Sequence, residues 1–144
     1  MTAIMKSVSP RICEKVANGD CTILVSKTAP KCEVPFKCYI YETKGKVIGE
    51  FICDKVFLLH PYTYDGGNAD LERRKLIQTF EGSSKENEIL AATCLTQDEM
   101  FDYIGAGNYG YGWHISNLKI YGNPKELSEF GFTRPPQSWC YIES

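Results

Sequence analysis

The sequence has 144 residues, 43% of them hydrophobic and 24% charged, which is the length and composition of one globular domain. It contains no run of about 18 apolar residues, so a transmembrane helix is not expected. The net charge of −2 argues against broad, non-specific binding to nucleic acid. The charge is uneven, however, because residues 1–55 carry a net +3 and residues 56–144 a net −5. A local basic face in the N-terminal half is compatible with this distribution.

The first elements of the chain are predicted from local signals. Ala3–Val8 has the mixed pattern of a short strand. Ser9 is a favourable N-cap residue, and Pro10 suits the first position of a helix. The Asn18-Gly19 pair favours a left-handed helix end, and residues 21–27 then favour extended backbone. A helix that stops this sharply before a strand forms a concave corner where a ligand can bind.

Two strands over 36–42 and 47–59, joined by a turn at 43–46, read as a hairpin that Gly49 bends. Residues 60–70 are expected to form a loop, whereas 71–80 and 83–95 are ambiguous. The capping box Thr96 to Glu99 begins a helix that ends at Gly105. A strand over 111–121, a short helix that begins at an Asn123–Glu126 capping pattern and ends near residue 130, and a strand over 138–143 complete the chain. We predict a single α+β domain over residues 1–144, a small mixed β-barrel of five to six strands with two to three flanking helices.

The seven cysteines indicate a reducing compartment. An odd number cannot be fully paired within the chain, and no two of them form a C-x-x-C pair. A short-spaced zinc site is therefore not expected, and the two histidines, His60 and His114, could form a catalytic zinc site only with cysteine or carboxylate ligands. The N-terminus lacks an apolar stretch of secretory length. We expect a cytoplasmic protein with mostly buried free thiols and with neither a metal nor a cofactor.

Candidate chemistry at the corner centres on Cys21. A nucleophilic cysteine needs a neighbouring base or cation that lowers its pKa. Lys27 lies about 20 Å away along an extended strand, which is too far to activate the thiol. A histidine from elsewhere, such as His114, would have to supply that role. Gly105 to Gly110 matches G-x-G-x-x-G as a string, but a helix precedes it and a strand follows, so a helix-to-strand loop is expected instead of a dinucleotide site.

Aromatic side chains beside cations are a second candidate feature, because they can stack on a nucleobase. Tyr39 and Tyr41 lie close to Lys37 in the sequence, and Tyr109 and Tyr111 lie in or beside the glycine-rich segment. Strand alternation indicates that Trp113 and His114 point to opposite faces of their strand. Trp113 has two readings, as part of the core or as a stacking surface. His114 likewise has two, as a structural residue or as a base.

Four stretches together resemble the ASCH domain family of the PUA-like superfamily, in particular variants from phages and mobile elements of Gram-positive bacteria. They are SPRICEKVANGDCTILVSKTAPK, PFKCYIYETKGKVIGEF, GYGWHISNLKIY and RPPQSWCYIE. The resemblance implies a small barrel with surrounding helices and a cleft beside the first helix. It also implies an association with RNA binding, and some members are hydrolases of acylated nucleosides or are linked to RNA cleavage.

The chain departs from the family at the catalytic positions. The frame of the family motif is kept at Gly19, Asp20, Thr22 and Lys27. The motif lysine is replaced by Cys21, a frequent Glu or Thr by Leu24, and the motif arginine by Ser26. Residues 91–95 lack the acid that hydrolytic members carry before the late helix. The resemblance therefore implies the fold without the amidohydrolase mechanism, since the charge pair that would shift the catalytic pKa values is missing.

We expect an RNA- or nucleotide-binding module with no assigned catalytic residue. The expected binding residues are Arg11, Cys21, Thr22, Ser26, Lys27, Tyr39, Trp113 and His114. One alternative is a nucleoside or RNA hydrolase with a re-tooled Cys21/His114 site. Another is a phage protein-interaction module that binds a host protein, which a large exposed apolar patch would favour.

Overall fold

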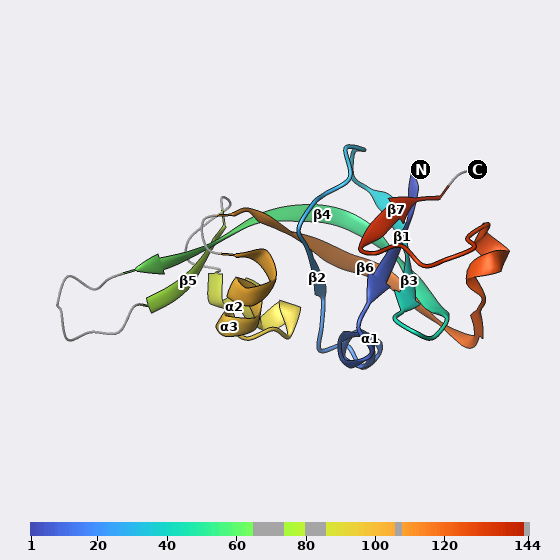
Figure 1. Ribbon diagram of the computed structural model, residues 1–144, viewed down its shortest axis with the longest axis horizontal. Coiled ribbons are helices and arrows are strands. Elements are labelled where there is room, and N and C mark those ends of the chain that lie inside the picture. Colours follow the sequence, from blue (N-terminus) through green and yellow to red (C-terminus); the bar gives the residue numbers. More distant parts are fainter. Residues whose placement is uncertain (65–73, 80–85, 106–107, 143–144) are drawn as a thin grey trace.

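The computed structural model describes residues 1–64, 74–79, 86–105 and 108–142 (Figure 1). Within them, seven strands join in one curled sheet in the order β2-β6-β4-β3-β1-β7, with β5 paired to β4. The strands are β1 (Ala3–Val8), β2 (Ile23–Ser26), β3 (Phe36–Glu42), β4 (Val47–Tyr64), β5 (Arg74–Thr79), β6 (Gly110–Lys125) and β7 (Trp139–Tyr141). The helices are α1 (Pro10–Ala17), α2 (Glu86–Thr93), α3 (Gln97–Ile104) and the 3-10 helix η2 (Leu127–Phe130). The predicted class, a small α+β barrel with flanking helices, is confirmed.

The sheet curls because its two longest strands, β4 and β6, pair along most of their length with several register shifts. β1 and β3 are parallel, and the other pairs are antiparallel. Side chains tie the segment after β2 to β7 at the opposite edge. Trp139 Nε1 donates to Thr28 Oγ1 at 2.8 Å, and the Lys31 amide donates to the Tyr141 hydroxyl at 3.0 Å. The two edges of the sheet, β2 and β7, are thus joined by side-chain hydrogen bonds through the segment after β2 and not by strand pairing.

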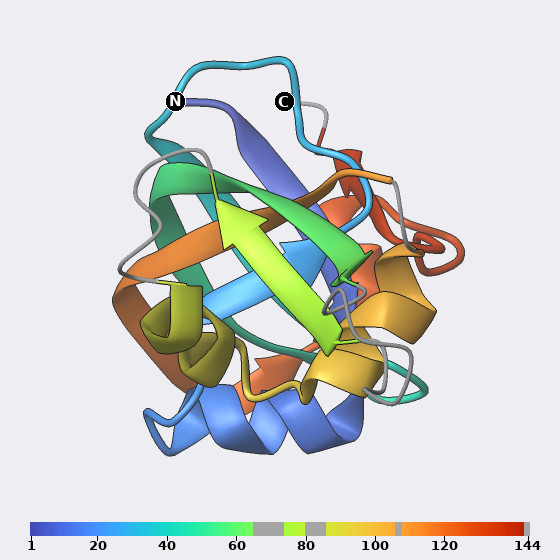
Figure 2. The same ribbon diagram turned by 90° about the vertical axis from the view of Figure 1, so that its left-hand side faces the viewer.

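The ends of α1 and α3 lie where the sequence predicts them. Ser9 Oγ accepts a hydrogen bond from the Ile12 amide, and α1 ends before Gly19, whose φ is +87°. Thr96 and Glu99 form the predicted capping box at the start of α3. Figure 2 shows α1 beneath the curled sheet with α2 and α3 beside it. No helix in the described part of the chain is long and apolar enough to cross a membrane.

The predicted loop over 60–70 is wrong in its first part, because β4 continues to Tyr64 and pairs with β5 (Figure 1). A proline is tolerated at position 61 because β4 pairs with β6 only as far as Leu59. On the β6 side of the strand, no amide donor is needed at Pro61. Residues 65–70 of that loop lie outside the described part. The ambiguous segments contain β5 and α2. β2 is shorter than predicted, and η2 is capped by Glu126 and Glu129 and not by Asn123.

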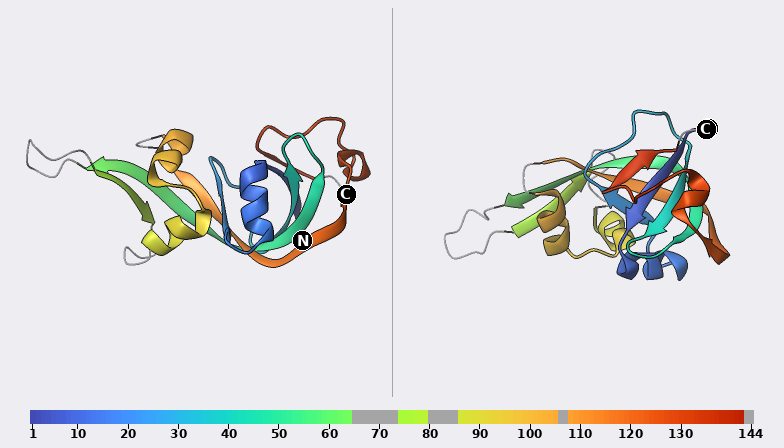
Figure 3. Two further views of the ribbon diagram at one scale, coloured as in Figure 1. Left: turned by 90° about the horizontal axis from the view of Figure 1, so that it is seen from below. Right: turned by 45° about the vertical axis from the view of Figure 1, so that its right-hand side comes forward.

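The interior of the curl is the main core. Trp113 and Phe36 are both fully buried there, and their rings meet edge to face with centroids 5.4 Å apart. A second cluster packs α2 and α3 against the outer side of β2 and β4, around Ile23, Leu59 and Met100. Figure 3 shows α1 lying across the mouth of the curl, next to β2. A cavity lies where the two clusters meet α1.

Candidate functional site

A cavity of 320 Å³ lies at the junction of β1, β2, α1 and α3, with part of its wall from the end of α2. Its lining is mostly apolar, from Val8 and Ile12 on one side and Ile23, Leu24 and Val25 on the other. Natural ligand cavities of this size hold small molecules in an apolar setting with a few polar groups. The cavity is therefore large enough for a nucleobase or nucleoside. It lies beside the first helix, between the start of α1 and β2, and residues 18–22 at the predicted corner do not line it.

Lys6 is the buried charge of this cavity. It lies on the same face of β1 as Ile4 and Val8, both in the interior core, and its side chain is only 4% exposed. Its Nζ lies 5.1 Å from the centre of the Trp113 ring. Burial lowers the pKa of the Lys6 amine to about 8, and the nearby Cys38 thiol raises it slightly. No carboxylate of the described residues lies within 4 Å of Nζ.

The other polar side chains of the lining already have partners. Ser7 Oγ donates to the Pro136 carbonyl at 2.6 Å. Thr93 Oγ1 donates to the Leu90 carbonyl at 2.6 Å and accepts from the Leu95 amide at 3.2 Å. Of the two charged residues in the lining, Glu99 is paired with Arg11, whereas Lys6 has no ion-pair partner among the described residues.

Two cations, Arg11 and Lys27, lie at the rim of the cavity, where each contacts a residue of the lining. Arg11 forms an ion pair with Glu99, which lines the cavity. Lys27 Nζ lies 5.1 Å from the ring centre of Tyr103, which also lines it. The predicted residues Arg11 and Lys27 therefore stand behind the lining and do not form it. Burial raises the pKa of the Tyr103 hydroxyl, so it remains a neutral hydrogen-bonding group at physiological pH.

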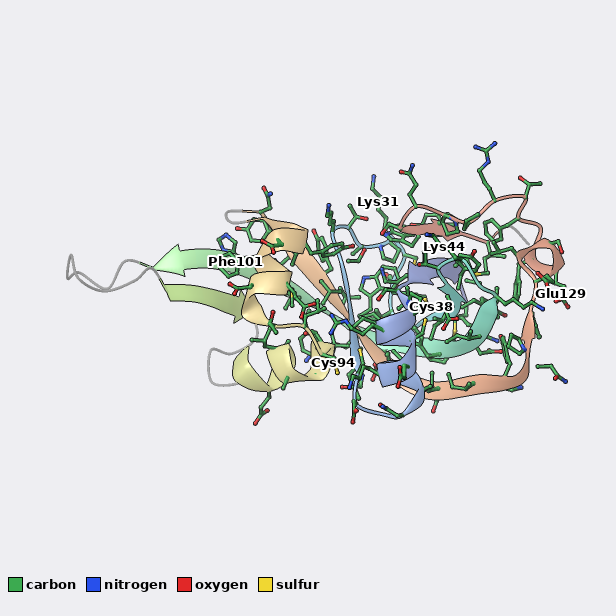
Figure 4. The ribbon with its side chains drawn as sticks, turned by 60° about the horizontal axis from the view of Figure 1, so that its bottom comes forward. Lys31, Cys38, Lys44, Cys94, Phe101 and Glu129 are labelled. Carbon is green, nitrogen blue, oxygen red and sulfur yellow. The ribbon has the colours of Figure 1, made fainter. Side chains whose placement is uncertain are left out.

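Cys21 lies inside the protein and not on the cavity surface. Its Sγ donates to the carbonyls of Ile23 at 3.3 Å and Thr93 at 3.7 Å. Burial raises the pKa of the thiol to about 12, and the neighbouring Cys94 adds to this shift. Figure 4 shows Cys94 between α2 and α1, and Cys38 inside the curl of the sheet. The prediction of Cys21 as a ligand contact or nucleophile is corrected, since a thiolate is the reactive form.

Trp113 is fully buried, so its reading as a stacking surface is corrected in favour of the core. Ser26, another expected binding residue, is also fully buried and does not line the cavity. It lies two residues from Leu24, which pairs directly with Trp113, so Ser26 and Trp113 face the same interior space. Within the described part of the chain, neither Ser26 Oγ nor Trp113 Nε1 has a hydrogen-bond partner. Two unsatisfied polar atoms thus lie in the interior that also holds Lys6.

The remaining predicted residues lie apart from the cavity. Tyr39 pairs with Met5 across β1 and β3, on the sheet face opposite Lys6, and its ring packs on Phe130 with centroids 4.8 Å apart. Thr22 is exposed, and its hydrogen bonds to the described residues are those of its backbone, with the Ala92 carbonyl and the Ile115 amide. Tyr39 and Thr22 are thus brought to other surfaces by strand alternation and by the short β2.

His114 binds to a carboxylate and not to a thiol. Its Nδ1 lies 2.6 Å from Asp54 Oδ1, on the face of β6 opposite Trp113. No hydrogen bond joins His114 to Cys21 among the described residues. The geometry therefore does not form the Cys21/His114 pair that a re-tooled hydrolase would need. In the same part of the chain, no three His, Cys, Asp or Glu side chains cluster as metal ligands would.

Lys6 was missed at the sequence level, although a signal was present. It lies on the same face of its strand as the apolar residues Ile4 and Val8, and a charged residue on such a face is unusual. Glu99 and Tyr103 were also missed, because their place at the cavity depends on how α3 packs against β2. The capping box predicts where α3 begins, but it does not predict which face of the helix lines the cavity.

No family model matches the sequence, and no curated protein matches it. Solved structures do match. The ASCH protein from Zymomonas mobilis aligns over 99% of this chain and 88% of its own, with a TM-score of 0.70 and 14% identity. A tyrosine-to-phenylalanine variant of that protein aligns over 100% of this chain and 92% of its own, with a TM-score of 0.71 and 13% identity. Identity this low is evidence for the fold alone, and the chain therefore has an ASCH-like fold.

Proposed function

We propose that this protein is an RNA- or nucleotide-binding module of the ASCH/PUA-like kind, which takes a base or nucleoside into the cavity beside α1. The observation that carries the proposal is a cavity of 320 Å³ with an apolar lining and one buried amine, that of Lys6. Apolar walls suit a flat heterocycle, and a small number of polar groups then orients it.

The rim supports the same proposal. Arg11 and Lys27 are exposed cations next to cavity-lining side chains, where they can meet the phosphates on either side of a bound base. The basic balance of residues 1–55 agrees with this placement. Phosphate contacts of this kind give affinity and orientation, whereas the cavity gives selectivity.

We further propose that the module lacks the amidohydrolase site that the family resemblance implies. Such chemistry needs an activated group and an acid or base within hydrogen-bonding distance. Cys21 replaces the motif lysine and is buried as a neutral thiol, and Leu24 is an apolar part of the cavity wall. All seven cysteines are free thiols, which fits a cytoplasmic location.

The test is a titration of the full chain with nucleosides and with 12-nucleotide single-stranded and hairpin RNAs, at several salt concentrations. We expect nucleosides to stabilise the protein, by about 2.7 kcal/mol at a ligand concentration of 100 times Kd. We also expect RNA binding to weaken as salt rises. The absence of both effects would overturn the proposal. Turnover of acylated nucleosides would overturn the second part alone.

A further inference from the structure

We infer that Lys6 makes the cavity selective for bases that carry a keto oxygen where others carry an amino group, so uracil, guanine and hypoxanthine bind better than cytosine and adenine. This inference rests on the proposed function, and it concerns the identity of the base. It depends on what the floor of the cavity can donate and accept.

The floor donates hydrogen bonds. A protonated lysine offers three N–H donors and no acceptor, and Lys6 is the buried charged residue of the lining, with 4% exposure. Its Nζ lies 5.1 Å from the centre of the Trp113 ring, which is buried behind the lining and holds the ammonium group in place. A keto oxygen placed here accepts a charge-assisted hydrogen bond. An amino group in the same place would put its N–H donors next to those of the Lys6 ammonium group, and no hydrogen bond could form between them.

The acceptors of the lining nearest to that clash already have hydrogen-bond partners. The Glu99 carboxylate is held by Arg11 through one oxygen and by the Thr96 amide through the other, at 3.0 Å. Thr93 Oγ1 both donates and accepts within its own helix end. A buried amino group would thus have to share an acceptor that is already bound or lose its hydrogen bonds to water, and a site rejects a ligand strongly on that basis.

The geometry also sets the size and the orientation of the ligand. A volume of 320 Å³ is near the lower end of the range for ligand cavities, and it suits one base with part of its sugar. Because Lys6 is at the floor and Arg11 and Lys27 are at the rim, the base edge enters first and the sugar-phosphate side faces outward. The same contact is available to a free nucleoside and to an unpaired base in RNA.

Isothermal titration of the full chain at pH 7 tests the inference with two matched pairs, inosine against adenosine and uridine against cytidine. Oligouridine and oligocytidine of 12 nucleotides extend the test to RNA. We expect the keto member of each pair to bind about tenfold or more tightly than the amino member. We expect Lys6→Met to lower the affinity of the keto member to that of the amino member, while Lys119→Met, at an exposed site on β6, leaves both unchanged.

A second variant guards against a folding defect. Lys6→Gln presents both a donor and an acceptor, so it should bind keto and amino bases with similar affinity. Near-ultraviolet circular dichroism of the buried Trp113 reports whether each variant retains the native core. Equal binding of keto and amino bases to the wild type, or a preference that survives in both variants, overturns the inference and leaves the proposed function intact. No binding of any nucleoside or oligonucleotide overturns the proposed function itself.

Discussion

The Lys6 ammonium group lies 5.1 Å from the centre of the Trp113 ring, inside the curled sheet and at the floor of the cavity. Its neighbours on β3 and α3 include three titratable groups, Cys38, Glu99 and Tyr103. A charge kept in such a place costs folding free energy, and the cost can be measured.

Lys6→Met should stabilise the protein at pH 7. The native pKa of about 8, against the usual 10.5, corresponds to a burial cost of about 3 kcal/mol. The attraction of the Trp113 ring offsets about 1 kcal/mol, so we expect the free energy of unfolding to rise by about 2 kcal/mol. Urea denaturation measures it, with Lys119→Met as the exposed control. A loss of stability at pH 7 would contradict this account.

The same variant has a predicted pH dependence. Between pH 8 and 10.5 the unfolded chain holds the Lys6 proton and the native protein does not, so this residue makes the wild type more stable as pH rises. The advantage of Lys6→Met should therefore shrink above pH 8 and disappear near pH 10.5. Buried thiols such as Cys13 and Cys53, with raised pKa values, lower stability above pH 9 in both proteins and cancel in the difference. A pH-independent difference would refute the prediction.

Thiol labelling should separate the cysteines into two groups. Cys13, Cys21, Cys38 and Cys53 are buried, with raised pKa values, so iodoacetamide should leave them unmodified in the native protein at pH 7.5. Cys32, Cys94 and Cys140 are partly exposed and should react first. Peptide mapping by mass spectrometry gives the order, and labelling in urea is the control that all seven can react. Rapid labelling of Cys21 in the native state would revive the nucleophile hypothesis.

The rim should govern the salt dependence of RNA binding. Lys27 is exposed and lies over Tyr103, so Lys27→Ala should weaken binding of a 12-nucleotide RNA and lower the slope of log affinity against log salt by about one. The affinity for a free nucleoside should not change, because the lysine does not line the cavity. Fluorescence anisotropy over a series of KCl concentrations measures the slope. Lys119→Ala is the matched control, and an equal effect there would show that the contact is not specific to the rim.

Gly49 should be intolerant of a side chain. A Cβ atom added there would lie 2.5 Å from the Lys119 carbonyl oxygen, in the bent crossing of β4 and β6. Because this oxygen belongs to the backbone, the strands would have to separate, and we expect Gly49→Ala to cost about 2 kcal/mol of stability. Gly122→Ala, on the same β6 strand, meets no atom within 4 Å and should be close to neutral. Comparable urea midpoints for the two variants would contradict the prediction.

The elements with local signals were predictable from sequence. Ser9, Gly19 and the Thr96/Glu99 capping box fix the ends of α1 and α3 through hydrogen bonds within a few residues. The strands of the hairpin follow from alternation, and the predicted bend at Gly49 coincides with a register shift. The continuation of β4 past His60 was not predictable, because the tolerance of Pro61 depends on which neighbouring strand is present.

The candidate site was predictable only in its neighbourhood. The cavity lies between the start of α1 and β2, where Leu24 lines it, and not at the corner after α1. Its chemistry comes from β1 and α3, which are distant in the chain and meet only through packing. The depth of Cys21 and Trp113 is likewise a property of the closed barrel, so neither residue's role could be assigned from its neighbours in the sequence.

The pairing of β1 with β7 bears on the order in which the protein folds. Met5 lies opposite Cys140, so the strand that carries Lys6 has one of its two neighbours about 135 residues away along the chain. The full pairing of β1 therefore depends on a contact between distant parts of the chain, and such contacts form late in folding because a long loop must close first. We accordingly expect the cavity wall that Lys6 forms to become ordered later than the β3–β4 hairpin, whose strands are neighbours in the sequence.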